Sequence, residues 1–200
     1  MDAMAWPRVS PHVEREILRT LGAGGFGRVV LARHPRGDGP ERSVDLALKV
    51  PSRLGGATRK KILWEAACLR EVEHPHVIRL LDVCASTPGK EADGRDLPIL
   101  VLPRADVDLA TFLNDRHRGV RPTALARRMM GQLSAALAHV HPHGIIQRDV
   151  KPGNCLIFFA ADTYGAFRLA GMSRQLCPRR VDTWALDLRA HGGREEEAGG

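Results

Sequence analysis

The sequence predicts an α+β fold, in which a β-rich N-terminal part with one helix is followed by a more helical part. Three features predict this fold. Apolar, β-branched runs bounded by turn residues recur through the N-terminal half of the chain. Helix-forming residues fill 59–72, and an apolar helical period follows over 123–141. A glycine-rich turn over 22–27 lies between the first two expected strands.

The glycine-rich turn has the pattern G-x-G-x-x-G. In dinucleotide-binding folds the last glycine of this pattern opens a helix, but residues 28–33 are β-branched and strand-like. A Walker-type loop would need Lys and then Ser or Thr after Gly27, and Arg-Val stands there. Because they lack Cβ atoms, Gly22, Gly24 and Gly27 would let backbone N–H groups approach phosphates. An ordinary glycine-rich hairpin is the alternative.

The next expected strand carries a lysine inside an apolar run. Residues 44–50 alternate in polarity, and Lys49 lies near their end. A half-buried ammonium needs a partner. Glu65 lies on the apolar face of the following helix and is the candidate, whereas Glu71 and Glu73 lie on other faces or past the helix end.

Two more strands are expected over 77–83 and 97–102, because both runs are apolar. Asp108 begins a short helix, and Pro122-Thr123 begins the longer one. The apolar residues of the longer helix are expected to form core, not a cofactor site. They are Leu125, Met129, Leu133, Leu137 and Val140.

The most informative segment is 146–157, which reads I-Q-R-D-V-K-P-G-N-C-L-I. It places Lys151 two residues after Asp149, and Asn154 five residues after it. The segment resembles the catalytic loop of protein kinases, H-R-D-x-x-x-x-N, with Gln147 at the position of the His. In that family the Asp accepts or orients the proton of the attacking hydroxyl, the Asn holds a metal ion, and the Lys neutralises charge on the moving phosphoryl group.

The resemblance is to protein kinases of the Ser/Thr type, and it implies a two-lobed fold with a β-rich small lobe carrying one helix and an incomplete helical large lobe. The implied parts are an N-terminal extension (1–16), a kinase-like domain (17–188) with small lobe (17–102), hinge (103–107) and partial large lobe (108–188), and a disordered tail (189–200). The resemblance also implies ATP binding, Mg²⁺, and phosphoryl transfer from ATP to protein hydroxyls. The implied catalytic residues are Asp149 and Lys151, with Asn154 as the metal ligand. The implied ATP site consists of Gly22, Gly24, Gly27, Val29, Ala47, Lys49, Glu65, Leu102 and Leu156.

The chain departs from the family at the Asp-Phe-Gly motif. Either Gly171 and Met172 replace the Asp and the Phe, or two residues are deleted and Gly171 is the motif's glycine. The order of residues 171–174 favours the deletion. On either alignment no carboxylate directly follows Ala170. Asp162, the nearest carboxylate upstream, is expected in a turn with residues 163–165.

A second departure follows at once. Only a few residues separate Arg174 from Asp182, the expected anchor of the catalytic loop, so the activation segment and its substrate-docking platform are missing. Three hypotheses follow: a working kinase, a kinase-like binding module without catalysis, and a mis-assembled fragment of a kinase. An incomplete large lobe would also leave Leu133, Leu137 and Val140 as an apolar face in water.

The composition of the chain limits the classes of binding partner that are expected. The chain has 200 residues, with 30 Lys and Arg against 23 Asp and Glu. These basic residues are dispersed, without aromatic interleaving, so no nucleic-acid partner is expected. No apolar run approaches the roughly 20 residues of a membrane helix, and the N-terminus does not resemble a signal peptide. ATP is the expected ligand, and neither the protein substrate nor a regulatory protein partner can be named.

The cysteines and histidines give no metal motif. The 4 cysteines show no C-x-x-C spacing and suggest reduced thiols in the cytoplasm or nucleus. His139, His141 and His143 invite comparison with a zinc site, but Pro142 breaks any shared helical face.

Overall fold

The structure, a computed structural model, describes residues 16–24, 27–35, 43–51, 56–85, 98–115, 123–160, 163–171 and 173–174. Several predicted features lie outside these residues. They are nearly all of the N-terminal extension, Asp162, Met172, Asp182 and the tail 189–200.

The N-terminal part forms a five-stranded antiparallel sheet in the order β1-β2-β3-β5-β4. Its strands are β1 (Glu16–Gly24), β2 (Gly27–Pro35), β3 (Ser43–Val50), β4 (Asp82–Ala85) and β5 (Pro98–Pro103). Because successive side chains of a strand point to opposite faces, the sheet supplies two apolar clusters. Ala47 and Leu100 belong to the larger cluster, whereas Leu46, Leu48 and Val101 belong to the smaller one.

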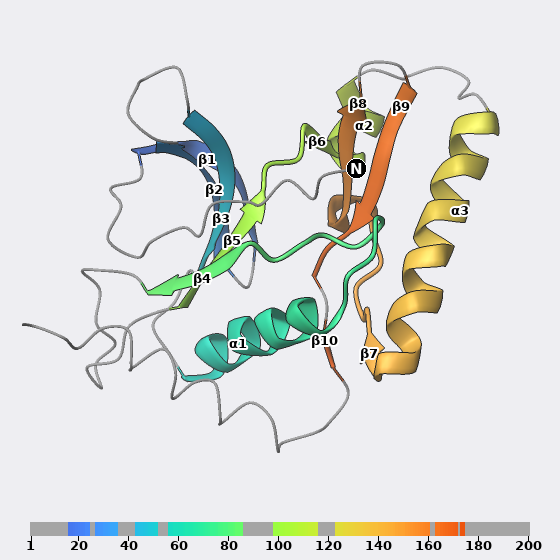
Figure 1. Cartoon of the computed structure of the whole chain (residues 1–200). Helices are drawn as coiled ribbons and strands as arrows, with labels where there is room; N and C mark the ends of the chain where they lie inside the picture. Colours follow the sequence, from blue (N-terminus) through green and yellow to red (C-terminus); the bar gives the residue numbers. More distant parts are fainter. Residues whose placement is uncertain are drawn as a thin grey trace, which may run out of the picture.

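Helix α1 (Gly56–Glu71) packs beneath the sheet, as Figure 1 shows. Its buried residues Ile62, Ala66 and Leu69 recur at spacings of three and four, which places them on one face. All three join Ala47 and Leu100 in the larger cluster. The predicted β-rich lobe with one helix is therefore confirmed.

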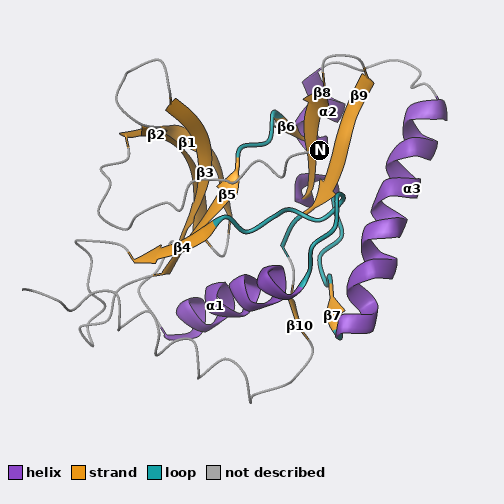
Figure 2. Cartoon of the chain, in the orientation of Figure 1, coloured by secondary structure: helices purple, strands orange, loops and turns teal. Residues whose placement is uncertain are grey.

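The C-terminal part holds the remaining elements. They are β6 (Val107–Asp108), α2 (Leu109–Asp115), α3 (Thr123–Val140), the 3₁₀ turn η1 (His141–His143), β7 (Ile145–Ile146), the 3₁₀ turn η2 (Pro152–Asn154), β8 (Cys155–Ala160), β9 (Thr163–Leu169) and β10 (Ser173–Arg174). The strands form a sheet in the order β6-β8-β9 and a pair of β10 with β7. Figure 2 shows β8 and β9 on the side of α3, apart from the five-stranded sheet, and β10 next to the end of α1. No described helix combines the length and the apolar character needed to cross a membrane.

The apolar face of α3 is covered, so the expectation that it lies in water was wrong. Leu133 and Val140 are buried, and Leu137 is half-buried against the same cluster. Strand β9 supplies the cover with Phe167 and Leu169, both of which belong to that cluster. The expectation failed because it assigned the cover to missing helices and not to β9, the second strand after the catalytic loop.

The strand expected over 77–83 is also shorter than predicted. Regular pairing begins only at Asp82, in β4. Before it, the Ile78 N–H donates to the Leu169 carbonyl at 3.0 Å, and the Leu169 N–H donates to the His76 carbonyl at 2.9 Å. The Leu81 N–H, by contrast, already donates to the Val101 carbonyl of β5 at 2.9 Å. The backbone around Val77 therefore bonds to β9 and links the two lobes, and contact with the five-stranded sheet begins only at Leu81.

The turn expected at residues 163–165 is wrong as well. β9 begins at Thr163, which pairs with Ala160 of β8. Residues 163–165 thus open a strand, and Asp162 lies outside the described residues.

Candidate functional site

The glycine-rich turn closes the hairpin of β1 and β2, with Gly24 paired to Gly27. Gly27 has φ of 149°, and a Cβ there would collide with the Val50 carbonyl oxygen and lie 3.2 Å from the Pro51 Cα. Glycine is required at this position because the end of β3 passes so close. At Gly22, by contrast, a Cβ would meet nothing within 4 Å. Residues 25–26, at the tip, lie outside the described part of the chain.

Lys49 of β3 and Glu65 of α1 form an ion pair. The Lys49 Nζ lies 2.5 Å from the Glu65 Oε2, and the side chains are only 21% and 10% exposed. The two rival glutamates, Glu71 and Glu73, are exposed. The pair therefore sets the position of α1 relative to the sheet and holds the ammonium beside β2, since Lys49 pairs with Val29.

Apolar side chains from both lobes meet next to this pair. Ala47 and Leu102 are buried in the larger cluster, and Val29 and Leu156 are half-buried against it. These four come from β3, β5, β2 and β8, so the structure unites strands of the small lobe with one of the large lobe. Such a set can enclose a flat apolar ring.

The segment between β7 and β8 forms a compact polar network around Asp149. The Asn154 amide donates to the Asp149 carbonyl at 2.6 Å and to its Oδ2 at 3.1 Å. The Lys151 Nζ lies 2.5 Å from the same Oδ2. The hydrogen bond from Lys151 is the main cause that lowers the pKa of Asp149 below its usual value. Burial acts in the opposite direction, and the hydrogen bond from Asn154 lowers the pKa further. Asp149 is therefore a carboxylate at neutral pH, which suits a group that orients a hydroxyl.

Gln147 ties this network to the end of β9, a role that sequence reasoning missed. Its side chain is buried, its Oε1 accepts from the Asp149 N–H at 2.8 Å, and its Nε2 donates to the Ala170 carbonyl. An amide can accept and donate at once, so Gln147 satisfies both groups. The available signal was a single polar residue between the apolar pair Ile145-Ile146 and the charged loop.

Gly171 lies directly against this network. It has φ of 76°, and a Cβ there would lie 3.2 Å from the Gln147 Nε2 and 3.6 Å from the Asn154 Nδ2. A side chain at 171 would thus lie between Gln147 and Asn154, next to the residue that holds a metal ion in the family. This position favours replacement of the Asp by Gly171 over the deletion that the residue order had suggested.

The residues present do not fit a magnesium clamp made by an Asp and an Asn together. Asn154 supplies one side-chain oxygen, and Gly171 supplies none. Within the described ranges, no group of three His, Cys, Asp or Glu could hold a metal ion. The second metal ligand of the family is therefore missing at the point where it would stand.

The two lobes, the part-buried Lys–Glu pair and the Asp–Lys–Asn loop together define a kinase-like type of domain. The chain belongs to the protein kinase family: the sequence pattern of the Protein kinase domain matches residues 15–178. The family in general uses ATP and Mg²⁺.

The chain is similar to several curated protein kinases. It is 37% identical over 145 residues to a "Carbon catabolite-derepressing protein kinase" of Candida albicans, covering 71% of this chain and 21% of that protein. It is 31% identical over 192 residues to "Cyclin-dependent kinase 4" of Rattus norvegicus, covering 90% and 59%. It is 34% identical over 164 residues to "Serine/threonine-protein kinase ATG1c" of Arabidopsis thaliana, covering 80% and 20%. The chain thus spans between about a fifth and three fifths of the length of these relatives.

Proposed function

We propose that this chain binds an adenine nucleotide between its lobes, and that it does so with little help from magnesium. The observation that carries the proposal is the ion pair of Lys49 and Glu65. The Lys49 ammonium lies 2.5 Å from the Glu65 carboxylate, on the strand next to the one that follows the glycine turn. The apolar set of Val29, Ala47 and Leu156 would enclose the base. Backbone N–H groups near Gly27 would face the phosphates.

Lys49→Met is expected to weaken ATP binding by about 10–100-fold, because a hydrogen bond to a charged group contributes about 1.5–3 kcal/mol. The measurement is isothermal titration of the full chain with ATP in EDTA. The matched control is Lys60→Met, which removes an exposed lysine of α1 and should leave the affinity unchanged. Equal affinities of all three proteins would contradict a nucleotide site at Lys49.

Gly171→Asp is expected to create the magnesium dependence that the natural chain lacks. The new carboxylate would point at Asn154, and an aspartate tolerates the positive φ of 76° better than most residues do. Magnesium should then lower the Kd for ATP at least about tenfold, the effect of 1.4 kcal/mol of added interaction. Gly171→Asn has the same shape without the charge and should show no such gain. A similar gain in both variants would mean that Gly171 is not the lost metal position.

A working protein kinase that phosphorylates Ser or Thr hydroxyls is the second candidate. The network of Asp149, Lys151 and Asn154 favours it, since these residue types at this spacing perform the transfer in the family. The similarity to Ser/Thr kinases supports the same substrate class. The missing carboxylate at Gly171 is the reason to rank nucleotide binding first.

The proposed compartment is the cytoplasm or the nucleus. The three cysteines within the described ranges, Cys68, Cys84 and Cys155, are buried thiols, which suits a reducing compartment. Burial also raises the pKa of the Cys155 thiol, so it stays protonated next to Asn154.

A further inference from the structure

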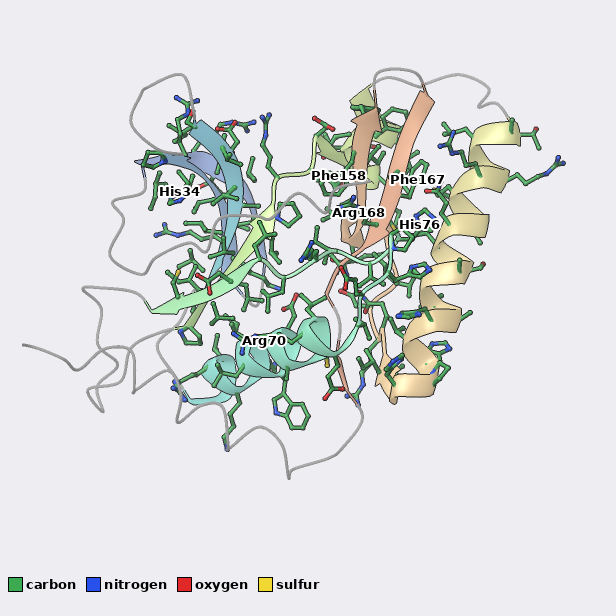
Figure 3. The ribbon with its side chains drawn as sticks, viewed as in Figure 1. His34, Arg70, His76, Phe158, Phe167 and Arg168 are labelled. Carbon is green, nitrogen blue, oxygen red and sulfur yellow. The ribbon has the colours of Figure 1, made fainter. Side chains whose placement is uncertain are left out.

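Four histidines meet where the loop after α1 contacts the end of α3. The rings of His74 and His139 are stacked, with centroids 4.8 Å apart and planes at 23°. His76 meets His74 edge-on at 5.5 Å, and His143 lies 5.2 Å from His139. His76 lies beside Phe167 next to α3 in Figure 3. We call these four residues the histidine cluster.

Hydrogen bonds define the proton positions on two of these rings. The His76 backbone N–H donates to the His74 Nδ1 at 3.2 Å, so this nitrogen carries no proton. The His76 Nδ1 lies 3.1 Å from the Phe167 carbonyl oxygen, which can only accept, so that nitrogen carries one. Protonation of the His74 Nδ1 would therefore remove the acceptor of the His76 amide.

The surroundings of His74 oppose its positive charge. Burial is the first cause that lowers its pKa from 6.5, followed by the positive charges that His139 and His76 would carry. No carboxylate is among the causes that act on this ring. The facing groups are His139 of α3 with His143 behind it, and its loop neighbour Glu73 is exposed to solvent. The His139 Nε2 is buried without a hydrogen-bond partner.

The geometry of the histidine cluster does not suit a metal ion. The rings of His74 and His139 lie in nearly parallel planes, so their lone pairs do not converge on one point. The His74 Nδ1 is already an acceptor for a backbone amide. The histidine cluster is therefore suited to respond to protonation and not to bind a metal ion.

The histidine cluster lies at a junction between the lobes. The same loop bonds to Leu169 of β9 on both sides of Val77, and it continues directly from α1, which carries Glu65. We propose that the histidine cluster is an acid-sensitive latch, closed with neutral rings near pH 7 and opened by protonation of His74. Opening separates the end of α1 from α3 while the five-stranded sheet stays folded.

The sign of the pH dependence follows from the direction of the shift. The folded chain binds the His74 proton more weakly than the unfolded chain, whose pKa is near 6.5. Stability from the latch is therefore fully present above pH 6.5, and it is lost as the pH falls from 6.5 through the lower value of the folded state.

The first test is the melting midpoint of the full chain between pH 7.5 and 5.5. His139→Phe keeps a stacked ring but cannot be charged. The variant lacks the positive charge on His139 that opposes protonation of His74, so its midpoint should fall by roughly 2–4 °C less than that of the natural chain. The control His141→Gln removes an exposed histidine from the same turn and should behave like the natural chain. Parallel curves for all three proteins would overturn the latch.

The second test needs no variant. Exchange of the histidine C2 hydrogen, followed by mass spectrometry across this pH range, gives the protonation midpoint of His74 in the natural chain. A midpoint below 6.5 is expected, together with loss of protection at the His76 amide at pH 5.5 while the Leu100 and Val101 amides of β5 stay protected. A midpoint at or above 6.5, or equal loss of protection in β5, would overturn the proposal.

Discussion

Phosphoryl transfer from ATP to a peptide is expected to stay near background for this chain. Removing one preorganised electrostatic group commonly costs roughly 10²–10³ in rate, and Gly171 stands where the chain would need a second metal-binding side chain beside Asn154. The measurement is incorporation of labelled phosphate into a Ser/Thr peptide library, with Asp149→Asn as the reference for background. Turnover well above that reference would contradict the expectation and make the chain a working kinase.

Gly171→Asp provides the gain-of-function arm of the same assay. If the missing carboxylate alone limits the reaction, this variant should incorporate phosphate faster than the natural chain. The double variant with Asp149→Asn should show no such increase. If Gly171→Asp binds magnesium and ATP but transfers nothing, the limiting loss lies in peptide docking. Both outcomes leave the nucleotide site intact, so the assay separates binding from chemistry.

Phe167→Ala is expected to lower the free energy of unfolding by about 3–5 kcal/mol, because it deletes a buried aromatic ring and leaves a cavity. Phe167 is 1% exposed, and it packs in one cluster with Leu133 and Val140 of α3. Its backbone N–H also donates to the Gln132 Oε1 at 2.8 Å, and this bond survives the substitution. Urea unfolding measures the loss.

The matched control for this substitution is Phe159→Ala. Phe159 belongs to the neighbouring strand β8 and is 53% exposed, so its loss should cost less than about 1 kcal/mol. Hydrogen exchange should locate the Phe167 effect in α3 and β9. Equal effects of the two substitutions would mean that β9 does not hold α3 in place.

Local patterns in the sequence predicted much of the small lobe. The alternation around Lys49 predicted β3, and helical spacing selected Glu65 from three glutamates, which is the residue that Lys49 contacts. These predictions worked because alternation and spacing follow from backbone geometry within one element.

Features that depend on contacts between elements could not be predicted from the sequence. The strand expected over 77–83 is shorter because its backbone bonds to Leu169, about ninety residues later. Gln147 has two partners, Asp149 and Ala170, and the second is reached only through the fold of β9. The position of Gly171 was likewise ambiguous until its direction toward Asn154 was known.

The hydrogen bonds of His76 and Ile78 to Leu169 have a mechanical consequence. The backbones of the two lobes are joined by the chain segment after β5 and also by these hydrogen bonds. A rotation that moves the five-stranded sheet away from β9 while both connections hold must turn about the line that joins them. Because this line passes close to the end of α1, a small rotation about it would produce a larger displacement at the distant glycine turn.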